Sequence, residues 1–157
     1  MTTGILATLQ GTLAGPGQEA TVSHGVVVVE LAPEALLATV KRLKSELGFD
    51  LFLDVTAVDW PDREPRFDVV YHFYSTQHHF RVRLKTRVPE SEPIVDSLIG
   101  LYGSARYMER ECHDMYGIVF RGNADLRPIL LYEGFDGHPL RKDYPKRREQ
   151  PLVRFRK

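Results

Sequence analysis

Apolar residues recur with a helical period early in the chain. Between Pro33 and Gly48 they are spaced by four, three and four positions, at Leu36, Val40, Leu43 and Leu47. This spacing gives a helix one apolar face, with proline in the first turn and glycine at the end. It therefore predicts a helix that packs on a core.

The middle of the chain has the period of strands. Within residues 80–88, apolar residues alternate with arginine and lysine, which indicates a strand with one buried and one solvated face. Runs of β-branched and aromatic residues predict further strands at 26–31, 51–58 and 67–74. The remaining expectations are helices at 3–13, 94–101 and 104–116, loops at 14–18 and 61–65, and a short strand at 118–120.

This order of elements predicts an α+β fold, with a mainly antiparallel sheet and helices packed on one face. Residues 1–121 are the expected α+β domain. Residues 122–157 lack a period and are the expected extended arm, without a core of its own. The arm keeps apolar residues, such as Ile129 and Phe135. Structureless segments of this length are uncommon unless they are functional or held by something else, so we expect another protein to cover the arm.

Charge is unevenly distributed, although the net charge is zero. Residues 141–157 hold eight Lys or Arg and two Asp or Glu, whereas residues 1–140 hold thirteen and nineteen. The basic segment is either a solvated tail or a surface for an acidic partner. Nucleic acid is disfavoured as a partner because the acidic body would be repelled by phosphates.

Composition also bounds the location of the chain. A length of 157 residues suits one domain. No apolar run approaches the ~20 residues of a membrane span. No Lys or Arg precedes Lys41, so neither a secretory leader nor an Arg-rich transit peptide is expected. The single cysteine suits a reducing cytoplasm.

The candidates for chemistry are weak. Cys112 and His113 are adjacent, and neighbours on a helix do not face each other. Cys112 shares an apolar face with Met108 and Met115, so we expect a buried thiol. Two further groups have no recognised metal spacing and are expected at turns and strand ends: His72, His78 and His79, and Asp54, Asp59, Asp62 and Glu64.

No motif for a redox carrier or an enzyme is present either. One cysteine cannot hold an iron–sulfur cluster. The glycine-rich phosphate loops and the nucleophile elbow are absent from the sequence. We therefore expect a non-catalytic chain with no cofactor and no metal of its own.

The segment from Gly134 to Asp143 is the best candidate for binding. Its two glycines permit sharp bends, and Arg141 can form bidentate pairs with carboxylates. Such a segment suits the acidic groove of a partner protein. The alternative is a loop that caps its own domain.

A longer stretch carries a family resemblance. It contains in order Glu109-Arg110-Glu111, Asp114, Tyr116-Gly117-Ile118, Asp125-Leu126-Arg127, Ile129-Leu130, Gly134 to Asp143 and Tyr144-Pro145. This order resembles the thirty-kilodalton subunit family of respiratory complex I, the bacterial NADH:quinone oxidoreductase. The chain departs from the family pattern at His113, Asn123-Ala124 and Pro128.

The resemblance implies an accessory subunit of the peripheral arm of that complex, on the cytoplasmic side of the membrane. The implied partners are the large subunit that frames the quinone site and the small subunit with the terminal iron–sulfur cluster. Flavin and iron–sulfur clusters would belong to partner subunits. The charged residues of the motif are the expected docking contacts: Glu109, Arg110, Glu111, Asp114, Asp125, Arg127, His138, Arg141, Lys142 and Asp143.

Two alternatives remain open at this point. Related subunits serve membrane-bound hydrogenases and ferredoxin-linked complexes, which the motif does not separate. A free-standing RNA-binding domain would need aromatic residues on an open sheet face, whereas the solvated positions of the 80–88 strand are arginine and lysine.

Overall fold

A computed structural model describes residues 2–13, 18–147 and 150. Its main sheet has five strands in the order β1 (Glu19–Ser23), β2 (Val26–Leu31), β5 (Phe80–Val88), β4 (Phe67–Ser75) and β3 (Leu51–Asp59). The pairs β1–β2, β3–β4 and β4–β5 are antiparallel, and β2–β5 is parallel. The predicted α+β class with a mainly antiparallel sheet is confirmed.

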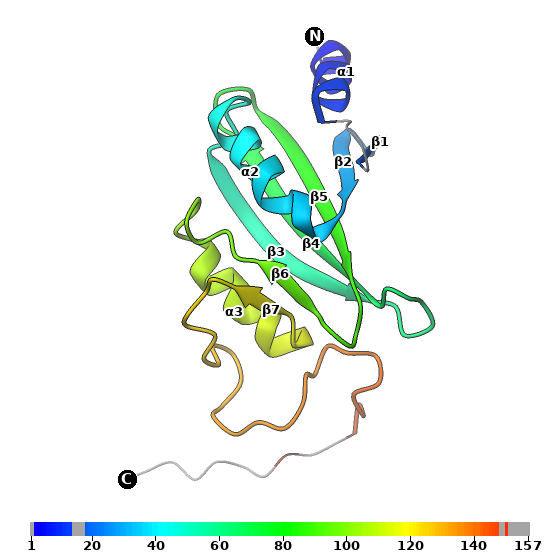
Figure 1. The fold of residues 1–157 in the computed structure, drawn as a ribbon, viewed down its shortest axis with the longest axis vertical. Coiled ribbons are helices and arrows are strands. Elements are labelled where there is room, and N and C mark those ends of the chain that lie inside the picture. The colour runs from blue at the N-terminus through cyan, green and yellow to red at the C-terminus, as the bar shows by residue number, and fades with distance from the viewer. Residues whose placement is uncertain (1, 14–17, 148–149, 151–157) are drawn as a thin grey trace.

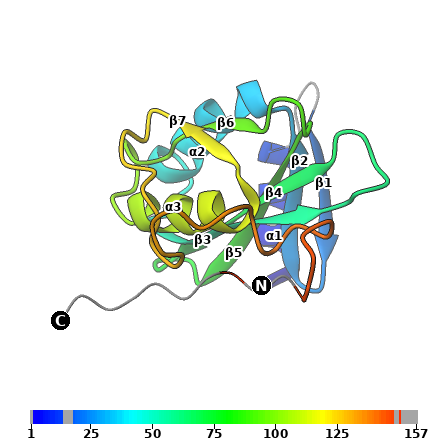
Figure 2. The same ribbon diagram turned by 90° about the horizontal axis from the view of Figure 1, so that it is seen from below.

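The helices supply one side of a single core (Figures 1 and 2). They are α1 (Thr2–Leu13), the short 3₁₀ helix η1 (Pro33–Ala35), α2 (Leu36–Ser45) and α3 (Ala105–Tyr116). Their buried residues meet alternate residues of the strands, among them Leu13, Leu36, Val40, Leu43, Val27, Val29, Leu84, Tyr71 and Phe73. Burial of such side chains stabilises the fold by about 1.5–3 kcal/mol each. The period-four face of α2 is confirmed by this packing.

The opposite face of the sheet carries polar side chains. The register sets His72 beside Arg83, Val70 beside Lys85, and Asp68 beside Arg87. On this face Arg83, Lys85 and Arg87 are partly or fully exposed, whereas Asp68 and Val70 are buried. None of the described helices covers this face.

A second, two-stranded sheet corrects one expectation. Residues 94–101 do not form a helix: Ile94–Asp96 is strand β6, and it pairs in parallel with β7 (Val119–Arg121). The two β-branched residues after Pro93 favour a strand. Its pairing partner, β7, follows α3 in the chain. The pattern also missed β1, a mostly exposed edge strand that pairs with β2.

The arm after Gly122 contains no helix or strand in its described part, residues 122–147. In Figure 1 it runs below α3 and turns back toward the ends of β3 and β4. Within the described residues, no helix is long and apolar enough to span a membrane. The expected loop at 14–18 lies almost wholly outside the described residues.

Candidate docking site

Glu109 anchors the start of the arm from inside the protein. Its side chain is 0% exposed. The carboxylate accepts hydrogen bonds from Ser97 Oγ at 2.7 Å, the Leu98 amide at 2.7 Å and Asn123 Nδ2 at 2.9 Å. Burial raises the pKa of Glu109, and these three hydrogen bonds partly oppose the rise. In place of the expected contact with a partner protein, Glu109 joins residues 97–98 to the first residues of the arm.

Asp114 holds the next part of the arm in the same way. It is 4% exposed. Its Oδ2 accepts the amides of Ile129 at 2.8 Å, Leu130 at 3.0 Å and Leu131 at 3.3 Å. Hydrogen bonds to an ionised carboxylate are among the stronger ones in proteins. Asp114 thus fixes the arm to α3, which differs from its expected role on a partner. Both acids were expected among the docking contacts, and they are buried because α3 is covered on two sides.

The arm also completes the C-terminal end of α3. An α-helix leaves its last carbonyls without partners inside the helix. Here the Asp114 carbonyl accepts from His138 Nδ1 at 2.9 Å, the Met115 carbonyl from the Leu140 amide at 3.2 Å, and the Tyr116 carbonyl from Arg141 Nε at 2.6 Å. Three consecutive carbonyls are therefore capped by residues 138–141. Burial lowers the pKa of His138, which favours the neutral ring with Nδ1 protonated.

Gly117 makes this cap sterically feasible. It is the C-cap of α3, with φ +78°, and its amide bonds to the His113 carbonyl at 2.7 Å. A Cβ atom at this position would lie 2.5 Å from His138 Nε2 and 2.7 Å from Arg141 Nη2. Glycine is required both by the left-handed backbone and by the closeness of the arm.

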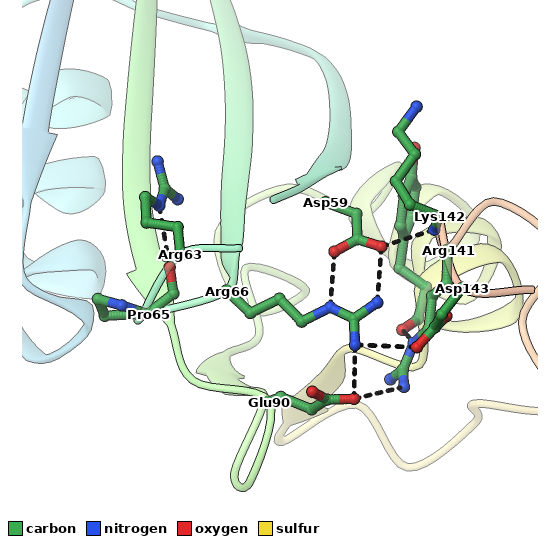
Figure 3. A network of polar contacts seen from close by, with 9 residues as sticks. Asp59, Arg63, Pro65, Arg66, Glu90, Arg141, Lys142 and Asp143 are labelled. Atoms are coloured by element: carbon green, nitrogen blue, oxygen red, sulfur yellow. Dashed lines mark hydrogen bonds and ion pairs between the residues drawn. The ribbon is translucent and has the colours of Figure 1, made fainter. Parts of the chain in front are cut away.

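A cluster of charges ties the far end of the described arm to the sheet (Figure 3). Asp59 ends β3, and Arg66 precedes β4. Arg66 binds Asp59 through two parallel hydrogen bonds of 2.7 and 2.9 Å. Asp59 Oδ2 also accepts the Lys142 amide at 2.7 Å, and Arg66 Nη1 lies 3.0 Å from Asp143 Oδ2. We call Asp59, Arg66, Glu90, Arg141, Lys142 and Asp143 the clamp.

The Asp59–Arg66 pair dominates the clamp energetically. The Asp59 side chain is 0% exposed and that of Arg66 is 7% exposed, whereas Glu90 and Asp143 are 51% and 55% exposed. Exposed ion pairs contribute ~0–1 kcal/mol, whereas removing one member of a buried pair costs ~3–5 kcal/mol. The hydrogen bonds from Arg66 are the main reason that the pKa of Asp59 is lowered. The buried pair therefore forms the base on which the arm rests.

The other predicted docking residues lie nearer to solvent. Arg110 donates to the carbonyls of Arg127 at 2.9 Å and Pro128 at 2.8 Å. Arg127 pairs with Asp125 at 2.7 Å on the surface, and Arg127 lowers the pKa of Asp125 to about 2. Glu111 is exposed. The side chain of Lys142 extends away from the clamp in Figure 3.

The sequence analysis did not identify three members of the site, and it did not show why residue 117 has to be glycine. Asp59, Arg66 and Glu90 were not predicted as contacts, and Asp59 was expected at a solvated strand end. One signal was available: Asp59 and Phe67 pair across the hairpin, so an acid at 59 lies near a base at 66. Asp54 is exposed and Asp59 is buried, although both belong to β3.

Two of the residues that were considered as candidates for chemistry, Cys112 and His79, lie in the core and beside a turn. Cys112 is 2% exposed, as expected for a small core residue, and burial raises the pKa of its thiol well above the ordinary range. His79 Nδ1 lies 3.1 Å from Tyr74 Oη beside the β4–β5 turn. Across the part of the chain that the structure describes, no three His, Cys, Asp or Glu side chains gather as metal ligands. The geometry of the site suits holding a segment in a defined shape.

Comparison with known proteins gives a consistent result. The family model described as respiratory-chain NADH dehydrogenase, 30 Kd subunit, matches residues 29–150. A subunit of the NADH-quinone oxidoreductase of Agrobacterium fabrum is 45% identical over 128 residues, covering 80% of this chain and 64% of the relative. The like-named subunit of Geotalea uraniireducens is 45% identical over 122 residues, covering 78% of this chain and 74% of the relative.

Two solved structures share the fold. A trypsin-resistant fragment of Nqo5 matches with a TM-score of 0.69 and 28% identity, covering 80% of this chain and 100% of the fragment. A chain of the membrane-bound sulfane sulfur reductase, an archaeal respiratory membrane complex, matches with a TM-score of 0.79 and 24% identity. That match covers 92% of this chain and 85% of the other.

The region that the family model matches contains the second half of β2, the strands β3 to β7, α2, α3 and the described arm with its clamp, and it leaves out β1. This chain spans 64% of the length of its Agrobacterium relative. Sequence identity of 45% over four-fifths of the chain and a family model covering residues 29–150 agree. The chain belongs to the family of the 30 Kd subunit of respiratory-chain NADH dehydrogenase.

Proposed function

We propose that this chain is a non-catalytic accessory subunit in the peripheral arm of a proton-translocating NADH:quinone oxidoreductase, where it scaffolds the quinone-site module. The family supports the assignment to the complex, because the curated relatives are named as subunits of NADH-quinone oxidoreductase. The archaeal sulfane sulfur reductase chain is 24% identical and shares the fold. The choice of NADH as donor therefore rests on the relatives at 45% identity.

The observation that carries the scaffolding role is the arrangement of the arm. Its inner side is occupied by hydrogen bonds to Asp114, to the end of α3 and to Asp59. Its outer side leaves Ile129, Leu130 and Leu140 exposed by 38%, 62% and 49%. Apolar residues clustered on a segment without its own core mark an interaction site. The body thus shapes the arm, and the arm presents a surface to another subunit.

The proposed partners follow from the family. They are the large subunit that frames the quinone site and the small subunit with the terminal iron–sulfur cluster, on the cytoplasmic side of the membrane. Flavin and iron–sulfur clusters would be held by other subunits, and this chain would hold none. The fragment of Nqo5 that resists trypsin is matched in full by 80% of this chain, which supports a compactly folded body.

The test is affinity purification of the tagged full-length chain from its own host in mild detergent, followed by mass spectrometry. The expected result is stoichiometric recovery of the quinone-site and iron–sulfur subunits, together with NADH:quinone activity in the eluate. Recovery of hydrogenase subunits or of RNA, or of the chain by itself, would overturn the proposal. Stoichiometric flavin or iron in the separately purified chain would refute the absence of a cofactor.

A further inference from the structure

A groove on the outer side of the arm combines apolar and cationic walls. It has a volume of about 440 Å³ and is lined by Pro139, Leu140, Arg141, Lys142, Tyr144 and Lys146. Leu140 is 49% exposed, although it is a large apolar residue. We call this the arm groove. It lies beside the clamp and shares Arg141 and Lys142 with it.

The walls of the arm groove are held in place by the body. Arg141 donates to the Tyr116 carbonyl at 2.6 Å, and its guanidinium lies 5.0 Å from the centre of the Phe67 ring. The Lys142 backbone is fixed by its 2.7 Å bond to Asp59. The Tyr144 ring stacks on Phe135, with centroids 6.1 Å apart. A groove that is rigid before binding loses less conformational entropy when it is filled.

The charge of the groove is positive. Residues 139–147 contain four cations (Arg141, Lys142, Lys146 and Arg147) and one acid, Asp143. Asp143 lies 3.0 Å from Arg66 of the body, so its charge is partly directed away from the groove. The Lys142 side chain and Lys146 are exposed. Long cationic side chains beside an apolar floor suit a carboxylate next to an apolar group.

We infer that the arm groove receives an acidic segment of a neighbouring protein in the same complex, with an apolar side chain on the floor and an adjacent Asp or Glu between Lys142 and Lys146. The inference deepens the proposed function and rests on it. It assigns docking to Lys142, Lys146 and Leu140, whose side chains face solvent. The buried acids of the motif, Glu109 and Asp114, hold the arm instead.

Charge favours a protein over an anionic membrane surface or a nucleic acid. Residues 1–140 carry thirteen Lys or Arg and nineteen Asp or Glu, a balance of −6. A broad anionic surface would be repelled by this body as it approached the groove. An acidic segment of a protein places its charge only where the cations are.

The first experiment reverses the charge of the groove in the full-length chain, expressed in its host in place of the wild type. Lys142→Glu/Lys146→Glu is compared with Lys41→Glu/Arg106→Glu, which changes two exposed cations on α2 and α3. Incorporation into the complex is measured on native gels. We expect the groove variant to assemble roughly tenfold less efficiently, and the control to assemble as the wild type does. Equal assembly of both variants would overturn the inference.

The second experiment identifies what occupies the groove. A photoreactive benzoyl-phenylalanine replaces Leu140, and the cross-linked peptide in the purified complex is sequenced. The expected product is a peptide of another protein of the complex, with Asp or Glu beside an apolar residue. A cross-link to lipid, to RNA or to a peptide without acids would overturn the inference. Flotation on phosphatidylserine vesicles of the wild-type chain, but not of the groove variant, would overturn it in favour of the membrane.

Failure of the inference can be told from failure of the proposed function. If the tagged wild-type chain does not recover the oxidoreductase subunits, the proposed function falls. If it recovers them and the groove variant recovers them equally, only the inference falls. Thermal unfolding of the separately purified variant checks that a loss of assembly does not come from misfolding.

Discussion

Gly117 meets two steric demands at one position, which makes it a sensitive point of the fold. Its φ of +78° is unfavourable for residues with a Cβ, and that Cβ would meet His138 and Arg141. The first demand arises within α3 and the second from the arm. A single methyl group at this residue therefore acts on both the helix end and the arm that caps it.

Gly117→Ala is expected to lower the free energy of unfolding by roughly 1–3 kcal/mol, from the left-handed backbone and the displaced arm together. The matched control is Gly103→Ala, where no atom lies within 4 Å of the added Cβ. Calorimetry of both variants measures the effect. An unchanged melting temperature for Gly117→Ala would show that the cap does not contact the helix end closely.

Glu109 gives stability a distinct dependence on pH. Its folded pKa is raised by burial above its unfolded value of ~4.3. The folded state therefore binds this proton more tightly. The resulting stability is present below the unfolded pKa and is lost as pH rises through the folded pKa. Asp59 has the opposite sign, because its pKa is lowered and its contribution is lost only in stronger acid.

Urea unfolding of the wild type and of Glu109→Gln between about pH 7 and about pH 5 tests this. We expect the wild type to gain stability relative to the variant as pH falls, because only the wild type takes up the proton. The opposing titration of His138 occurs in both proteins and cancels in the difference. Glu111→Gln, on the exposed side of the same helix, should run parallel to the wild type. Parallel profiles for Glu109→Gln would contradict the assignment.

At the scale of elements, α3 is the support of the arm. Its sheet side packs Cys112 and Met115 into the core. Glu109 and Asp114 are five positions apart and so lie on different sides of the helix, and each accepts hydrogen bonds from the arm. Its last carbonyls receive residues 138–141. A helix that is buried on two sides carries buried acids only because each acid accepts several hydrogen bonds.

Asp114→Ala removes the acceptor of three arm amides and should release residues 129–131 without unfolding α3. Hydrogen bonds to charged groups contribute ~1.5–3 kcal/mol, so these amides should exchange at least about tenfold faster. Hydrogen–deuterium exchange with mass spectrometry measures the rates. Glu111→Ala, on the same helix but exposed, is the control. Equal protection of residues 129–131 in both variants would exclude the proposed anchor.

For the whole molecule, the arm and the body depend on each other. The arm has no core of its own among its described residues, yet it supplies partners to Glu109, Asp114 and Asp59. Leu126 packs against the core. The division into a domain at 1–121 and an arm at 122–157 therefore remains a prediction, and the many polar contacts across it indicate a body that is weakened when the arm is removed.

A chain that ends at Arg121 should fold with a clearly lower melting temperature. Several buried acceptors lose their donors, and each such loss costs ~1–3 kcal/mol. Adding a synthetic peptide of residues 122–147 should raise the melting temperature again in a concentration-dependent way. A truncated chain as stable as the full one, with no response to the peptide, would mean that the arm is held only by its partner protein.

The sequence by itself determined the α+β class, the period of α2 and of the central strands, and the family. The period of apolar residues reflects which face of an element is buried. In α2 and β5 the apolar residues recur regularly on that face. The burial of Cys112 followed from the same reasoning. The family resemblance is carried by the motif from Glu109 to Pro145, and this motif can be identified without knowing the fold.

Only the tertiary structure decided what the charged motif does. Glu109 and Asp114 resemble solvated helix residues in sequence, and they are buried because residues 97–98 and the arm close over them. Strand β6 exists because β7 pairs with it, and the Asp59–Arg66 pair exists because a hairpin brings the two residues together. In each case the deciding contact joins positions that are separate in the chain, and local propensity contains no information about such contacts.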